Sequence, residues 1–337
     1  MPDNDHDDAQ QPADDAYAGV RDEAQPVIPA PDLPYRPTNP KNYNPAIALI
    51  GCGGITGAHL GAYKAAGYHV VALCDVDEAR ATERRDSFYP DADVLTNVND
   101  VLRRDDIEVV DIATHPRERY ALIEAALNAK KHVLSQKPFV LNIDAGDTLV
   151  ALADKQGVKL AVNQNGRWAP HVAYMRLAIA NGLLGEVFSA DLSVSFDHSW
   201  VVGTPFDAMY DLVLYDFAIH WFDMLTCYLG TQAPERVFAS VAQARRQRPK
   251  PPLLAHVVVD YPAAQATLSF NAATYFGHQD RTFLVGTQGT AHSYGPGLQD
   301  QSVEITTADG LMQPKLVGHW FNDGFHGAMA ELLCAIE

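Results

Sequence analysis

The first half of the sequence alternates short apolar segments with stretches of helical spacing, and this alternation restricts the fold more than any other feature. The apolar segments consist mainly of Val, Ile, Leu and Ala, which is typical of strands that are buried on both faces. Strands that alternate with helices of about 10–15 residues indicate βαβ units and a parallel sheet. The expected strands are residues 46–51, 69–75, 93–97, 108–114, 131–136 and 158–164.

After about residue 170 the pattern changes to segments in which apolar and polar residues alternate, with turn residues between them. Such segments indicate a mostly antiparallel sheet. Helices are expected at about 170–181 and 211–229. The fold class is therefore α/β: a doubly wound parallel sheet (Rossmann) domain over residues 45–164, then an α+β domain with a large, mostly antiparallel open sheet over 165–337. Residues 1–44, rich in acids and proline, are predicted to form a disordered tail.

A glycine-rich turn, GCGGITG, lies between the first expected strand and the first expected helix. Glycines allow a tight turn and a close approach of the backbone to a pyrophosphate, and the helix N-terminus offers free amides and a positive dipole end. This placement predicts dinucleotide binding by Gly51, Gly53, Gly54 and Ile55. The strict G-x-G-x-x-G pattern is not kept, because Thr56 stands at its last position, and a tight turn without a ligand is the alternative interpretation.

The second expected strand ends in Asp75. A carboxylate at this place accepts hydrogen bonds from the adenosine ribose hydroxyls and repels a 2′-phosphate, so we expect NAD as the cofactor. The alternative is an exposed acid at a strand end, since Asp77 and Glu78 follow immediately.

Composition and charge exclude several classes of function. The 337 residues carry a formal net charge of −17, which disfavours binding to nucleic acid or to an anionic membrane surface. The sequence shows no apolar run long enough to span a bilayer and no secretory signal pattern. The four cysteines are widely scattered, which suits a reducing compartment. We therefore expect a cytoplasmic protein without a membrane or nucleic-acid partner.

Several ordered motifs resemble the Gfo/Idh/MocA family of NAD(P)-dependent oxidoreductases. They are GCGGI, CDVD, ALNAKKHVLSQKP, NGRWAP, NGLLGEV and YDFAIHWFD, and they run from about residue 46 to the end of the chain. The resemblance implies a dehydrogenase of sugars, inositols or related polyols that forms a homodimer or homotetramer. Three features depart from the family pattern. Tyr120 matches the histidine that often follows the fourth strand in this family, and His115 stands near the cofactor-contacting turn instead. Gln136 replaces the usual glutamate before Lys-Pro, and the chain stops at Glu337 inside an apparent helix, so the second domain is expected to be truncated.

Three residues are candidates for catalysis. Lys137 follows an expected strand at the edge where a doubly wound sheet binds ligands, and an ammonium there can stabilise a developing alkoxide. In YDFAIHWFD, Asp216, His220 and Asp223 have the spacing of one helix face. The resemblance implies that His220 is the general base and that Asp216 is its neighbour and a substrate ligand, while Asp223 is expected to be structural. The alternatives are metal binding by Asp216 and His220, for which no third ligand is evident, and a buried histidine without catalytic function.

The resemblance also implies contacts near the nicotinamide and the substrate. The expected cofactor contacts at this end are Thr114, His115, Gln136, Lys137 and Asn165, and the expected substrate contacts are Lys137, Arg167, Trp168, Asp216 and His220. No metal is expected. An ion pair of Arg167 with a structural carboxylate is an equally good interpretation of that residue. His198, Trp200, Asp207 and Tyr210 belong to a loop that could shape specificity or form an ordinary lid.

The sequence thus predicts an NAD-dependent dehydrogenase that acts on a polyhydroxylated small molecule. Two alternatives remain at this point. One is a hydrolase or eliminase that uses NAD for transient oxidation, and the other is a catalytically silent NAD-binding regulatory protein.

Overall fold

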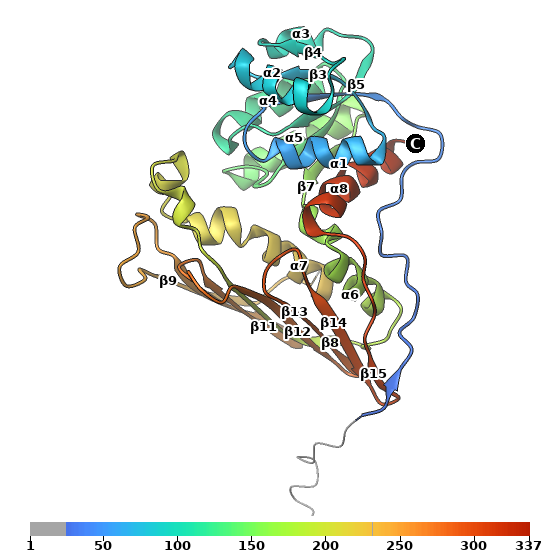
Figure 1. Cartoon of the computed structure of the whole chain (residues 1–337), viewed down its shortest axis with the longest axis vertical. Coiled ribbons are helices and arrows are strands. Elements are labelled where there is room, and N and C mark those ends of the chain that lie inside the picture. Colours follow the sequence, from blue (N-terminus) through green and yellow to red (C-terminus); the bar gives the residue numbers. More distant parts are fainter. Residues whose placement is uncertain (1–24, 231) are drawn as a thin grey trace, which may run out of the picture.

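The computed structural model describes residues 25–230 and 232–337, which fold around two β-sheets. The prediction of disorder for residues 1–24 lies outside the described residues. Figure 1 shows the smaller sheet with its helices in the upper part and the larger sheet in the lower part, with helices α6 and α7 between the two sheets. Within the described ranges, no helix has the length and apolar character that a membrane crossing requires.

The first sheet has six parallel strands in the order β4-β3-β2-β5-β6-β7. The order reverses between β2 and β5, and doubly wound sheets bind ligands at the carboxyl ends of the strands at such a point. The strands are β2 (Ala46–Ile50), β3 (His69–Cys74), β4 (Asp93–Leu95), β5 (Ile107–Ile112), β6 (His132–Gln136) and β7 (Leu160–Asn163). They confirm the predicted parallel sheet.

Five helices follow these strands and cover the two faces of the sheet. They are α1 (Thr56–Ala66), α2 (Glu78–Phe88), α3 (Val98–Leu102), α4 (Pro116–Asn128) and α5 (Ile143–Gln156). The side chains of Asp77, Asn97 and Asn142 cap the starts of α2, α3 and α5 by accepting backbone hydrogen bonds. Gly67 and Gly157 end α1 and α5 in the left-handed conformation.

The second sheet has nine strands in the order β1-β15-β14-β13-β12-β8-β11-β10-β9. All neighbours are antiparallel except β8–β11 and β1–β15, which are parallel. This confirms the predicted large and mostly antiparallel sheet. The strands are β1 (Val27–Ile28), β8 (Val187–Ser195), β9 (Arg236–Ala242), β10 (Leu254–Tyr261), β11 (Ala264–Asn271), β12 (Gln279–Gly286), β13 (Gly289–Gly295), β14 (Ser302–Thr307) and β15 (Gly310–Met312).

Helices α6 (Pro170–Ala180) and α7 (Ile219–Leu229) pack on one face of this sheet. Their side chains form one apolar core with the inward-facing residues of the strands, including Leu192, Leu268 and Leu284. The strand alternation places Arg281 and Phe283 on the opposite face.

The predicted disordered tail is wrong for residues 25–44. Strand β1 pairs with β15, and Leu33 is buried in the core of the second domain. The backbone amides of Lys41 and Asn42 donate hydrogen bonds to the side chain of Glu337. In Figure 1 this segment runs as a blue strap from the lower sheet to the upper one. Composition suggested disorder because the partners of this segment lie almost 300 residues away in sequence.

The C-terminal helix α8 (Trp320–Ile336) does not stay within the second domain. Phe325, Met329 and Leu333 join Leu60 and Tyr63 of α1 in the core of the first domain. The chain therefore returns to the dinucleotide-type domain at its end, which the predicted boundary at residue 165 does not describe. The apolar face of α8 is buried against α1. Figure 1 shows the red helix α8 beside the blue helix α1.

Candidate active site

The glycine turn lies at the carboxyl edge of the first sheet, between β2 and α1. Gly51 has φ +92°, and a Cβ on it would stand 3.0 Å from the backbone of Ala113 and Thr114, so only glycine fits there. A Cβ on Gly53 or Gly54 would meet nothing within 4 Å. These two glycines therefore face open space at the start of a helix.

The turn also leaves backbone donors free. Within the described chain, the amides of Gly53, Gly54 and Ile55 have no hydrogen-bond partner, and Ile55 is 39% exposed. The first turn of α1 carries no acidic residue, so the positive end of the helix dipole is not neutralised there. The turn thus fits a diphosphate group that approaches the backbone closely.

Asp75 lies beside this turn at the end of β3. Its Oδ2 accepts a hydrogen bond from the amide of Cys52 (2.7 Å), and its Oδ1 accepts one from the amide of Asp77 (2.9 Å). A surface groove next to it is lined by residues 76–79, 82, 83 and 86, four of which are acidic. Arg80 and Arg85 of α2 pair with Asp77 and Asp86. Arg84 lies 3.5 Å from Glu83 and also donates hydrogen bonds to the carbonyl oxygen of Gly53 (3.2 Å) and to the hydroxyl of Thr56 (3.3 Å) in the glycine turn. The side chains that line this groove include four acids and no base.

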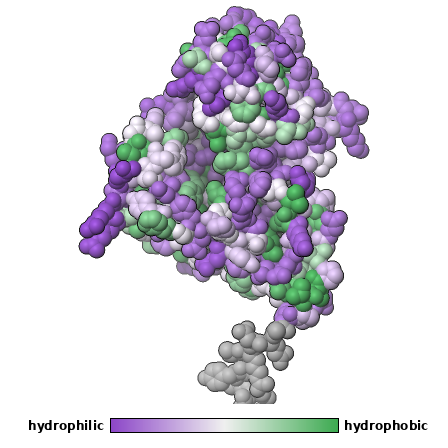
Figure 2. Space-filling model, viewed as in Figure 1, coloured by the Kyte–Doolittle hydropathy of each residue, from purple (hydrophilic) through white to green (hydrophobic). Residues whose placement is uncertain are grey.

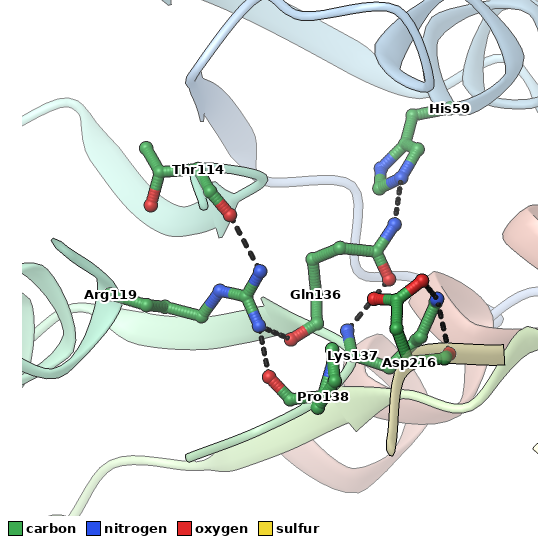
Figure 3. A network of polar contacts seen from close by, with 7 residues as sticks. All are labelled: His59, Thr114, Arg119, Gln136, Lys137, Pro138 and Asp216. Atoms are coloured by element: carbon green, nitrogen blue, oxygen red, sulfur yellow. Dashed lines mark hydrogen bonds and ion pairs between the residues drawn. The ribbon is translucent and has the colours of Figure 1, made fainter. Parts of the chain in front are cut away.

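Lys137 follows β6, and its ammonium points to Asp216 of the second domain (Figure 3). Its Nζ donates hydrogen bonds to the backbone oxygen of Asp216 (2.8 Å) and to the carboxylate Oδ2 (3.2 Å). Both side chains are mostly buried, at 18% and 17% exposure. An ammonium has three donors, so one remains without a partner in the described chain.

The predicted regular helix over 211–229 is wrong in its first part. Residues Leu212–Phe217 form a π-helix, and α7 begins only after Ala218. The wider turn changes the direction of Asp216, which pairs with Lys137 instead of His220. Asp223 forms a two-fold ion pair with Arg167, at 2.6 and 2.7 Å. Asp216, His220 and Asp223 therefore contact three different groups, whereas their spacing predicted one shared helix face.

His220 packs against the indole of Trp320, with ring centroids 5.6 Å apart. Its Nδ1 is shielded from solvent and has no hydrogen-bond partner among the described residues. Burial and the nearby charge of Lys137 hold the pKa of His220 well below its usual value. The imidazole is therefore neutral at neutral pH, which is the form that can accept a proton.

The segment after β7 makes structural contacts. The buried Asn165 accepts a hydrogen bond from the indole of Trp320 (3.3 Å). The indole of Trp168 packs directly on Gly327 of α8, so a Cβ added to Gly327 would overlap the indole ring. With the Arg167–Asp223 pair, these contacts fasten η2 (Asn165–Trp168), the short 3₁₀-helix, to α7 and α8. In the described chain, no hydrogen bond joins Arg167 or Trp168 to Lys137, Asp216 or His220.

Thr114 and His115 follow β5 at the same edge of the sheet as Lys137. The Thr114 hydroxyl is buried and has no hydrogen-bond partner within the described ranges. The ring of His115 lies 5.9 Å from that of Phe206, which belongs to the loop before the π-helix. This contact brings the loop of the second domain onto the turn that was predicted to meet the nicotinamide.

Two functional candidates, Arg119 and His59, escaped the sequence analysis, which named His198 only as part of a loop that could shape specificity. Arg119 is buried and donates hydrogen bonds to the backbone oxygens of Thr114, Gln136 and Pro138 (Figure 3). Burial lowers its pKa to about 10, so it keeps its charge. One guanidinium thus joins the chain after β5 to the turn that carries Lys137. Its position in the first turn of α4 offered no motif that could have identified it.

His59 of α1 and Gln136 of β6 are in contact through their side chains, 3.0 Å apart. Gln136 also accepts a hydrogen bond from the amide of Lys137 (2.7 Å). The residue that departs from the family pattern is therefore bonded directly to the main chain of Lys137. This contact required the folded structure, because 77 residues separate the two side chains.

His198 is 5% exposed and lies among Phe196, Trp200 and Phe217. Its Nδ1 is buried and lacks a hydrogen-bond partner in the described chain. Burial lowers its pKa to about 4, with opposing effects of Asp216, which raises it, and Lys137, which lowers it. The structure thus brings His198 near the Lys137–Asp216 pair.

The lowered pKa of His198 makes a prediction for stability. Unfolded histidine titrates near 6.5, so the unfolded chain binds a proton below that pH while folded His198 stays neutral down to about pH 4. Its contribution to stability is complete above about pH 6.5 and falls by about 1.4 kcal/mol per pH unit between those values. His198→Phe should remove this loss. Between pH 7 and pH 5, the free energy of unfolding in urea should fall by about 2 kcal/mol more for wild type than for His198→Phe. Equal pH dependence of the two proteins would contradict the assignment.

Among the residues that the structure describes, no group of three His, Cys, Asp or Glu side chains could hold a metal ion. On the face shown in Figure 2, the surface is hollowed between the upper and lower parts of the molecule. The glycine turn, Lys137 and Asp216 belong to the elements on the two sides of this boundary between domains.

Comparison with known proteins gives matches for both domains. Residues 46–164 match the "Oxidoreductase family, NAD-binding Rossmann fold", and residues 172–292 match the "GFO/IDH/MocA C-terminal domain". A D-apiose dehydrogenase from Paraburkholderia graminis is 30% identical over 207 residues, which cover 58% of this chain and 54% of that protein. The inositol 2-dehydrogenase of Rhizobium meliloti is 25% identical over 295 residues, covering 82% of this chain and 87% of that protein.

A solved structure shares the fold. It is an oxidoreductase from Agrobacterium radiobacter in complex with NAD+, L-tartaric acid and magnesium, with a TM-score of 0.77 and 23% identity. The similarity covers 87% of this chain and 89% of that one.

Proposed function

Because the chain belongs to the GFO/IDH/MocA family of oxidoreductases, we propose that it oxidises a hydroxyl group of a sugar, inositol or related polyol with NAD. Relatives that bear the names of apiose and inositol dehydrogenases support this substrate class. The observation that carries the proposal is the Lys137–Asp216 pair, which joins the edge of the NAD-binding domain to the second domain.

When bound, the nicotinamide supplies the acceptor for the hydride that leaves the carbinol carbon. The residues of the chain would bind and prepare the alcohol. Lys137, fixed by Asp216, donates its remaining N–H to the reacting oxygen and stabilises the charge that develops there. The neutral His220 accepts the hydroxyl proton. Asp216 orients the ammonium and balances its charge.

The glycine turn and the Thr114–His115 segment would hold the two ends of the dinucleotide. The free amides of Gly53, Gly54 and Ile55 fit the diphosphate, and Asp75 fits the adenosine ribose. Thr114, His115, Gln136 and Asn165 lie at or near the nicotinamide end in this proposal. Arg167 and Trp168 then stabilise the site through their contacts with α7 and α8.

The function is tested by following NADH absorbance while the full chain is offered a panel of aldoses, inositols and other polyols. Accumulation of NADH with one member supports the proposal and argues against transient oxidation, which releases no net NADH. Binding of NAD without turnover of any polyol in either mode would contradict it.

The cofactor preference provides a separate prediction. The acidic surface around Asp75 should repel a 2′-phosphate, so the KM for NAD should be lower than that for NADP. Asp75→Asn keeps the size and an acceptor for the Cys52 amide but removes the charge. We expect the KM for NADP to fall by about tenfold in this variant, because one repulsion of about 1.4 kcal/mol is lost. A wild-type preference for NADP would contradict the proposal.

A further inference from the structure

A buried chain of hydrogen bonds connects α1, the helix that begins at the glycine turn, to the main chain of Lys137. The Lys137 amide bonds to Gln136 Oε1 (2.7 Å), Gln136 Nε2 lies 3.0 Å from His59 Nε2, and His59 Nδ1 lies 2.7 Å from Asp111 Oδ2. Tyr63 also donates to this carboxylate oxygen (2.7 Å). His59, Tyr63 and Asp111 are fully buried, and Gln136 is 6% exposed.

The direction of every proton in this chain follows from one fixed donor. A backbone N–H can only donate, so the side-chain oxygen of Gln136 must face Lys137. Its NH₂ group then faces His59, and His59 Nε2 must accept. The ring proton of His59 is therefore on Nδ1, from which it is donated to Asp111. Burial and Asp111 raise the pKa of Tyr63 far above its usual value, so Tyr63 keeps its proton and donates too.

The groups around His59 are of mixed charge, and the Gln136 NH₂ group is the one that requires Nε2 to act as an acceptor. Asp111 on β5 is the carboxylate that faces it, and Tyr63 on α1 is a neutral donor. Phe325 of α8 stacks on the imidazole with ring centroids 4.2 Å apart and contributes no charge. The nearby cation is Arg119 of α4, whose own pKa is raised in part by Asp111.

The main chain at Lys137 is thus held from two sides. Gln136 binds its amide, while Arg119 binds the carbonyl oxygens of Gln136 and Pro138 (Figure 3). The side chain of Lys137 then extends from this fixed segment to Asp216. A displacement of the segment would move the ammonium by a similar distance, and misplacement by about 1 Å can reduce a rate about 100-fold.

We propose that His59 and Gln136 are positioning residues that seat Lys137, and that Gln136 imposes the neutral Nδ1–H tautomer on His59. The effect of this contact on turnover rests on the proposed function of Lys137. The tautomer of His59 and the fixed position of the Lys137 main chain do not depend on that function. A glutamate at position 136 would accept bonds from both the Lys137 amide and His59 Nε2. His59 would then need a second proton and become an imidazolium between two carboxylates.

The test compares Gln136→Leu and Gln136→Glu with wild type, and Gln279→Leu on the exposed side of β12 is the matched control. Ring-nitrogen NMR of the full chain without cofactor should show His59 protonated on Nδ1 alone in wild type and on both nitrogens in Gln136→Glu. Hydrogen exchange of the Lys137 amide should accelerate at least about tenfold in Gln136→Leu, because the amide loses its acceptor. In Gln136→Glu it should stay within about threefold of wild type, since the acceptor remains.

Kinetics with the substrate found in the polyol panel completes the test. Gln136→Leu should lower kcat by about 10–100-fold. Gln136→Glu should keep kcat within about tenfold of wild type, because the seat of the main chain is preserved. A wild-type His59 protonated on Nε2, or unchanged exchange of the Lys137 amide in Gln136→Leu, would overturn the proposal. Absence of any turnover in wild type, with the NMR and exchange results as expected, would instead refute the proposed function alone.

Discussion

Lys137→Met should lower kcat/KM for the polyol by about 10²–10³-fold. The substitution removes the ammonium that joins Asp216 to the reacting oxygen, while methionine keeps much of the length of the side chain. The Kd for NAD should change little, because the free amides of the glycine turn are untouched. Steady-state kinetics and fluorescence titration with NAD measure the two quantities.

The matched control for this variant is Lys155→Met, in the last turn of α5, where the lysine is exposed. It should leave kcat, KM and the Kd for NAD unchanged. A Lys137→Met protein that keeps kcat/KM within about threefold of wild type would exclude this lysine from the reaction, since donors to a developing oxyanion contribute much more.

His220→Asn should reduce kcat by about 10²–10⁴-fold, the usual contribution of a general base. Asparagine preserves a polar group of similar size beside Trp320 but cannot take up the hydroxyl proton. His256→Asn on the exposed side of β10 is the matched control and should be fully active. Full turnover of His220→Asn would refute the assignment of the base.

The pH dependence of the activity provides a second test of His220 as the general base, because the expected direction of its pKa shift is known. Burial, together with the nearby charge of Lys137, lowers the pKa of His220, so wild-type activity should not fall as the pH drops through 6.5. Removing the Lys137 charge should raise this pKa. The acid limb of the residual activity in Lys137→Met should therefore lie at higher pH than in wild type. A limb at lower pH would contradict the proximity of the two groups.

Most of the first domain could be predicted from the sequence because its signals are local. Each buried parallel strand is an apolar run of its own, and the glycine turn and Asp75 lie within 25 residues of each other. The predicted candidates Lys137 and Asp216 do meet in the structure. Their pairing was not predicted, because the regular spacing of Asp216 and His220 concealed the π-helix.

The parts that escaped prediction depend on partners that are distant in sequence. Strand β1 is too short to be identified without β15, and the apolar face of α8 could equally have packed on the second sheet. Arg119 and His59 lie in the first turns of the ordinary helices α4 and α1, and their importance follows only from the carbonyl and amide groups that they meet. Pairing of Arg167 with a carboxylate was one of two open interpretations, and the structure identifies Asp223 as its partner.

The sequence by itself determined the fold class, the family and the residue types that the chemistry requires, because strand periodicity, turn glycines and ordered motifs are encoded over short distances. The tertiary structure alone decided which of those residues meet. A hydrogen bond or an ion pair forms between atoms about 3 Å apart, and only the packing of α1, α4, β6 and the π-helix brings such atoms together around Lys137.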